Sequence, residues 1–155
     1  AIEYAALGAE SDRGLDTWFE KRAAADRKPG AGLETVEYQL TLFSSLPDKV
    51  QEQLLLQTLS EAETLKKDFE EMIASWRSGE MDKLQEFLYR DADKFPELMR
   101  EFLVKRNEAW VGPLMGYLEK GEQVMVLVGA GHLGGKSGLL ELLKASGCTI
   151  RQLGK

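Results

Sequence analysis

Residues 124–130 form the longest apolar run of the chain, and their length fits a β-strand and not a membrane-spanning helix. Residues 123–128 are rich in β-branched and apolar residues that alternate onto both faces, which is typical of a strand buried inside a sheet. A glycine-rich loop follows, then a helix predicted at residues 137–145 and a final strand at residues 149–153. This order predicts a βαβ unit with parallel strands at the C-terminal end.

The middle of the chain has the periodicity of helices. Apolar residues from Leu55 to Trp76 recur every three or four positions, which predicts one long helix over residues 47–78 that ends at Gly79. The aromatic residues Phe69, Trp76 and Trp110 are predicted to lie in the core. Four shorter helices are predicted, which contain Leu15, Val36, Leu84 and Pro96.

Sheet elements near residue 33 and after residue 123 frame this helical middle, so the expected fold is a predominantly helical α/β fold. A single βαβ unit does not cover both faces of a sheet, so the sheet is expected to be incomplete and to need further strands. The 155 residues are enough for one domain with a sizeable core. Because Ala1 is not a methionine, we expect a mature product or an excised piece.

Composition excludes several classes of function. The net charge of −6 argues against a general affinity for nucleic acid or for an anionic membrane surface. No apolar stretch is long enough to span a membrane. Cys148 is the only cysteine, so no internal disulfide is expected, and His132 is the only histidine, which excludes zinc sites built from several histidines of one chain.

The glycines at positions 129, 131 and 134 match the dinucleotide-binding pattern G-x-G-x-x-G. That fold also needs an acidic residue for the ribose about 20 residues further on, and no acidic residue follows Glu141. No nucleotide cofactor is therefore expected. The alternative interpretation of Gly129 and Gly131 is a tight turn between a strand and a helix.

Two polar residues are predicted at the same sheet edge. His132 follows the buried strand and Glu34 ends a short apolar piece before a helix, and ligands bind at this edge in open α/β sheets. A histidine and a carboxylate that meet there are able to hold a divalent metal with open positions for water. The structural alternatives are a histidine that bonds a neighbouring carbonyl and a carboxylate that caps a helix N-terminus.

Arg106 and Asn107 are a third candidate for a functional site. Arg106 falls on the apolar side of the helix that contains Trp110, where a guanidinium needs a carboxylate or a substrate anion. An internal ion pair with an acidic side chain is the structural alternative.

Taken together, these residues resemble the motifs of the TraB/GumN family, which includes the Tiki proteins. The matching motifs follow the family's order along essentially the whole chain: Gly32-Leu33-Glu34-Thr35 with Gln39, Arg106-Asn107 with Trp110, and residues 128–133 with Gly138-Leu139. The resemblance implies a metal-dependent hydrolase, in some relatives a protease, with peptide or another small polar substrate. It also implies export to the periplasm or beyond.

The family pattern contains two copies of G-x-x-H, and residues 129–132 resemble the second copy. By this resemblance, Glu34, Arg106, Asn107 and His132 line the active centre, with His132 and Glu34 as ligands of a divalent metal. The chain then corresponds to the C-terminal part of the family domain, without its N-terminal strands and first G-x-x-H. Such a half site is expected to bind metal weakly and to be inactive by itself.

Two alternatives to an enzyme stay open at this point. The apolar helices are suited to sequester a peptide or haem without turnover. An incomplete sheet also favours a helical fragment that is stabilised by dimerisation, as a homo-oligomer.

Overall fold

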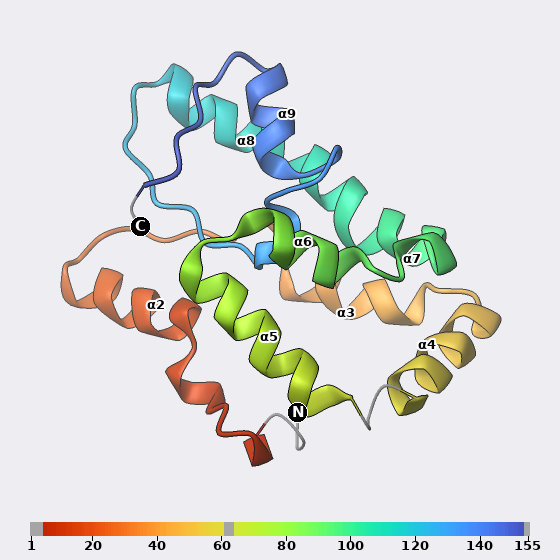
Figure 1. Ribbon diagram of the computed structural model, residues 1–155. Helices are drawn as coiled ribbons and strands as arrows, with labels where there is room; N and C mark the ends of the chain where they lie inside the picture. Colours follow the sequence, from red (N-terminus) through yellow and green to blue (C-terminus); the bar gives the residue numbers. More distant parts are fainter. Residues whose placement is uncertain (1–4, 61–63, 154–155) are drawn as a thin grey trace. The chain divides into compact units, whose positions relative to one another are not determined.

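The structure, a computed structural model, describes residues 5–60 and 64–153 of the chain. Helices dominate it, and the chain divides into two compact units, Ala1–Thr35 and Val36–Lys155 (Figure 1). The first unit contains helix α2, Leu15–Ala25. The second unit contains α3 Val36–Ser44, α4 Asp48–Ser60, α5 Leu65–Ser78, α6 Met81–Tyr89, α7 Pro96–Met99, α8 Lys105–Glu119 and α9 Leu139–Ala145. No helix in the described part of the chain is long and apolar enough to cross a membrane.

The predicted sheet and the C-terminal βαβ unit are wrong, because the described residues contain no β-strand. Residues 123–128 and 149–153 run outside any helix but do not pair with each other. The second segment lies instead against the turn after α5, where Gln152 Nε2 donates to the carbonyl oxygen of Gly79 at 2.9 Å. A strand requires a hydrogen-bonded neighbour, and the hydrophobic pattern specifies an apolar, extended segment without specifying that neighbour.

The predicted sheet element near residue 33 is also absent from the described structure, which has a bend there. A Cβ atom on Gly32 would lie 2.7 Å from the carbonyl oxygen of Glu34, so the chain folds back too closely for a side chain. The bend leads into α3, which begins at Val36 as predicted.

The predicted long helix corresponds to two described helices, α4 and α5, and Ala62 of its apolar stripe lies outside the described residues. The predicted end at Gly79 is confirmed: this residue adopts the left-handed conformation with φ 69°, and its N–H donates to the carbonyl of Trp76 at 3.2 Å. Trp76 itself is 47% exposed, so its predicted place in the core is wrong. Periodicity shows which residues share a helix face but not whether a neighbouring element covers it.

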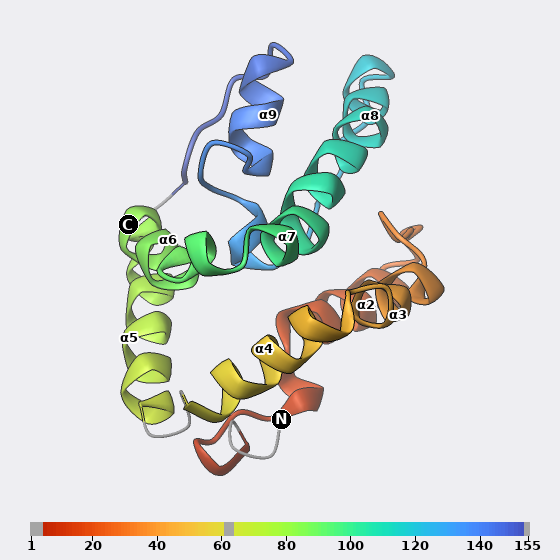
Figure 2. The same cartoon turned by 90° about the vertical axis from the view of Figure 1, so that its right-hand side faces the viewer.

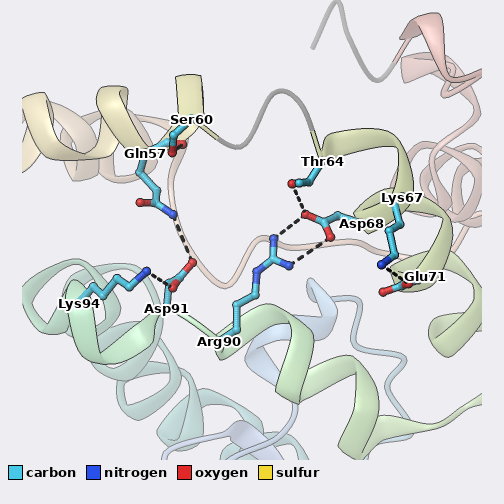
Figure 3. Close-up of polar contacts among 9 residues, drawn as sticks. All are labelled: Gln57, Ser60, Thr64, Lys67, Asp68, Glu71, Arg90, Asp91 and Lys94. Atoms are coloured by element: carbon cyan, nitrogen blue, oxygen red, sulfur yellow. Dashed lines mark hydrogen bonds and ion pairs between the residues drawn. The ribbon is translucent and has the colours of Figure 1, made fainter.

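Polar contacts tie α4 and α5 to the end of α6 (Figure 3). Arg90 donates to both carboxylate oxygens of Asp68, at 2.7 and 3.2 Å, and Thr64 donates to the same carboxylate at 2.8 Å. These donors hold the pKa of Asp68 below its ordinary value, with the hydrogen bond from Arg90 as the main cause. Asp91, the residue after Arg90, accepts a hydrogen bond from Gln57 of α4 at 3.2 Å.

The buried core of the second unit centres on α8. From Pro96, the predicted helix start, α7, a π-helical turn (η4, Arg100–Val104) and α8 follow one another without interruption. The buried face of α8 carries Asn107, Trp110 and Leu114, and α9 packs beside it (Figure 2). The buried apolar side chains of the described residues are Leu42, Leu46, Leu84, Trp110, Leu114 and Leu139. The burial of Trp110 confirms its predicted role.

Candidate functional site

Asn107 is the most buried polar residue of the described chain, with 1% of its surface exposed. It lies about one helical turn before Trp110 on the buried face of α8, a position where an unsatisfied amide would cost about 1–3 kcal/mol. Both ends of the amide are satisfied. Nδ2 donates to the carbonyl of Ser137 at 2.8 Å, and Oδ1 lies 2.7 Å from Nδ1 of His132.

These two contacts define the tautomer of His132. The Ser137 carbonyl only accepts, so the amino group of Asn107 must face it and Oδ1 must face the imidazole. Nδ1 of His132 therefore carries a proton, and in the neutral ring the lone pair is on Nε2. The imidazole is thus oriented as a proton acceptor or metal ligand through Nε2, with 8% of the residue exposed.

Trp110 contacts both the histidine and the neighbouring arginine. Its ring centroid lies 4.6 Å from that of His132, with the two planes inclined by 46°. The Arg106 guanidinium carbon lies 5.1 Å from the Trp110 ring centroid, a cation–π distance. Arg106 is half-buried and also donates to the carbonyl of Phe102 at 3.0 Å. Three of the four predicted site residues therefore belong to one cluster on α8 and the glycine-rich loop.

The glycine-rich loop is held by α6. His132 ends a short 3₁₀ turn (η5, Ala130–His132), and the hydroxyl of Tyr89 donates to the carbonyl of Gly131. Gln85, one turn earlier on α6, packs directly on Gly134: a Cβ atom there would lie 1.6 Å from the Gln85 amide nitrogen. That nitrogen is buried without a hydrogen-bond partner. The loop thus approaches α6 at a glycine because no side chain fits between them.

The Tyr89 contact predicts a pH dependence of stability. Burial raises the pKa of Tyr89 above its ordinary value of 10.0, because it disfavours the phenolate. The unfolded chain then loses the phenol proton at a lower pH than the folded chain, so this stabilisation is present below the unfolded pKa and is lost as the pH rises through the folded pKa. We expect wild-type protein to lose more stability than Tyr89→Phe between about pH 9 and about pH 11. Urea unfolding of both proteins across this range measures it, and parallel pH profiles would contradict it.

Glu34, the fourth predicted site residue, belongs to the first unit, whereas His132 belongs to the second. It is half-buried, at the bend before α3. The meeting of Glu34 with His132 stays a prediction.

The divalent metal expected from the sequence needs several ligands. Within the described residues, no three His, Cys, Asp or Glu side chains are grouped closely enough to hold one. The described residues therefore offer one oriented histidine ligand and do not fit a complete metal site.

A groove of about 620 Å³ lies between α5 and α6, away from the histidine. It is lined by Ser75 and Phe87 together with charged residues, of which Lys83 and Glu80 pair with each other at 2.8 Å. None of the four predicted site residues lines it.

Comparison with known proteins bears on the resemblance found in the sequence. The model of the TraB/PrgY/gumN family matches residues 1–152. The chain belongs to the TraB/PrgY/gumN family. Its match spans both units and includes every residue of the histidine cluster, so the family assigned from the sequence motifs is confirmed. Neither a curated protein nor a solved structure matches the chain.

Sequence reasoning missed three contributors to the cluster in this TraB/PrgY/gumN chain: Gln85, Tyr89 and the Ser137 carbonyl. Gln85 and Tyr89 are four residues apart on α6, the spacing of one helix face. Nothing in their spacing links them to a loop more than 40 residues later, as Tyr89 and Gly131 are separated by 42 positions. A backbone carbonyl carries no sequence signal at all.

Proposed function

We propose that this TraB/PrgY/gumN chain supplies the proton-accepting histidine of a hydrolase that acts on a peptide or another small polar carbonyl compound. The observation that carries the proposal is the Asn107–His132 hydrogen bond of 2.7 Å, which leaves the ring lone pair on Nε2. A general base needs an unprotonated ring nitrogen, and this tautomer places that nitrogen at Nε2.

The chemistry follows from this orientation. Nε2 of His132 accepts a proton from the attacking water as the water oxygen bonds to the carbonyl carbon and the carbonyl electron pair moves to its oxygen. Asn107 steadies the resulting imidazolium through Nδ1–H, and the imidazolium returns the proton to the leaving group as the bond from carbon to that group breaks. Arg106, held beside Trp110, supplies positive charge for the oxygen that becomes negative in the transition state. The described residues do not complete a metal site, so the proton transfer is assigned to His132 itself.

Capture of a peptide without turnover is the second candidate. It is favoured by apolar side chains that α3 and α4 expose: Val36 is 68%, Leu40 70% and Leu59 64% exposed. Apolar residues at helical spacing on a surface are the anchors that a peptide helix or strand recognises.

Replacing His132 with glutamine separates the two candidates. Glutamine keeps an amide near Asn107 but provides no base, so hydrolysis of a fluorogenic peptide library is expected to fall by about 10²–10⁴-fold. Lys136→Ala, an exposed change on the same loop, is the matched control and is expected to retain activity. Equal rates for wild type and His132→Gln would exclude His132 as the base. Saturable peptide binding by wild-type protein without any cleavage would favour the second candidate over the hydrolase.

A further inference from the structure

The peptide unit between Gly131 and His132 is held at both of its polar ends. Its carbonyl oxygen, on Gly131, accepts a hydrogen bond from the hydroxyl of Tyr89 on α6. Its N–H group, on His132, donates to the carbonyl of Gly129 at 2.9 Å. Because a peptide unit is planar, holding its two ends fixes the plane and therefore the point from which the side chain of His132 extends.

Glycines leave this peptide unit free to rotate unless another group holds it. Gly129 and Gly131 have no side chains, so their backbone dihedrals are less restricted than those of other residues. A Cβ atom on Gly131 would lie 3.9 Å from side-chain atoms of both Leu88 and Leu103, which is ordinary contact and does not lock the backbone. The bond to Gly129 lies within the loop, whereas the bond from Tyr89 joins the loop to a helix 42 positions away in the sequence. Tyr89 therefore fixes this peptide unit relative to α6.

The imidazole of His132 is held from a different helix. Asn107 of α8 accepts a hydrogen bond from Nδ1 at 2.7 Å, and the ring centroid of Trp110 lies 4.6 Å from that of the imidazole. Thus α6 determines where the side chain begins, and α8 determines where Nδ1 points. The position of Nε2, the other ring nitrogen, depends on both helices together.

We propose that Tyr89 is a positioning residue for Nε2 of His132 and acts through the carbonyl of Gly131. The inference rests on the proposed function, in which Nε2 accepts the proton of the attacking water. Without the Tyr89 hydroxyl, the peptide unit rotates, the imidazole leaves the line of the Asn107 amide, and Nε2 moves away from the substrate. A misplacement of about 1 Å is enough to lower a rate by about 10²-fold.

Labelling histidine with ¹⁵N tests this positioning without hydrolysis, because His132 is the only histidine of the 155 residues. One backbone signal and two ring signals then report on this residue alone. At about pH 8, where an ordinary imidazole is neutral, wild type is expected to show protonated Nδ1 and unprotonated Nε2.

Tyr89→Phe removes one oxygen atom and keeps the aromatic ring. It is expected to show both tautomers of His132, because the ring is no longer aligned with Asn107. Exchange of the His132 N–H with solvent is expected to be about 2–10-fold faster, since the opposite end of the same peptide unit has lost its hydrogen bond.

Hydrolysis provides the second readout. On the best-cleaved peptide of the library, Tyr89→Phe is expected to lower kcat by about 10²-fold and to leave KM within about twofold, because no contact with bound substrate is lost. Tyr117→Phe is the matched control, since no described hydrogen bond involves the hydroxyl of Tyr117 on α8. It is expected to match wild type in the ¹⁵N spectrum and in kcat.

Tyr89→Phe with the single tautomer of wild type would overturn the proposal, whatever its exchange rate, and so would Tyr117→Phe with equally altered ring signals. Both tautomers in wild type would overturn the proposal together with the Asn107 contact that supports the hydrolase. If Tyr89→Phe alters the ring signals but wild type cleaves no peptide, the positioning of His132 stands and the proposed function fails. Circular dichroism of each variant confirms that helix content is retained, so the ring signals report on the folded chain.

Discussion

Replacing Gly138 with alanine is expected to lower the free energy of unfolding by about 3 kcal/mol. A Cβ atom on Gly138 would lie 2.1 Å from the carbonyl oxygen of Gly134 and 2.4 Å from its carbon. These atoms are backbone, so relief requires the glycine-rich loop or the start of α9 to move. The φ of Gly138 is −73°, which alanine adopts easily, so the whole effect comes from the collision.

The matched control for Gly138→Ala is a glycine-to-alanine change that is expected to raise the free energy of unfolding. Gly116 lies inside α8, and a Cβ atom there meets nothing within 4 Å. Alanine is the better helix former, so Gly116→Ala is expected to raise stability by about 0.5–1 kcal/mol. Urea unfolding followed by circular dichroism measures both variants. Gly138→Ala with wild-type stability would contradict the close approach of Gly134 to the start of α9.

Replacing Asn107 with leucine is expected to lower the free energy of unfolding by a similar amount. The substitution keeps most of the side-chain volume but leaves the Ser137 carbonyl and the Nδ1–H of His132 without the partners they have now. Each loss costs about 1–3 kcal/mol in a buried site, so the expected total is about 3 kcal/mol. Urea unfolding of Asn107→Leu measures this loss.

Glu108→Leu on the exposed side of the same helix controls for the introduction of leucine and is expected to change stability by less than about 0.5 kcal/mol. The double variant Asn107→Leu/His132→Leu allows the coupling energy between the two residues to be measured. If the two residues interact as the 2.7 Å contact implies, the double variant loses less than the sum of Asn107→Leu and His132→Leu measured separately. Strict additivity would argue against the Asn107–His132 contact.

The sequence predicted helices well where local chemistry determines them. Pro96 begins a helix because its ring fixes φ and its missing N–H needs no partner there, and Gly79 ends one because it adopts φ 69° without strain. The strand prediction failed at residues 123–128 for a different reason. Apolar alternation predicts an extended segment, but a strand exists only with a neighbour, and the described chain provides none.

The residues of the candidate site were also predicted only in part from the sequence. His132 was found because it is the only histidine and follows glycines, and Asn107 through the motif that it shares with Trp110. The sequence interpretation placed Arg106 on the apolar side of its helix, where it is half-buried against Trp110, but it did not indicate that the neighbouring Asn107 is buried to 1% exposure. One position on a helix turns the side chain by about 100°, so the apolar stripe does not show which of two residues at its border is buried more deeply.

By itself, the sequence determined the family, the helical segments with their stop signals, and the residue types that are available for chemistry. Those properties depend on each residue and its near neighbours in the chain. Only the tertiary structure decided which ring nitrogen of His132 carries the proton, that Tyr89 and Gln85 hold the loop, and that two strand-like segments stay apart. These outcomes depend on contacts between residues far apart in sequence, and such contacts form only when whole helices pack against each other.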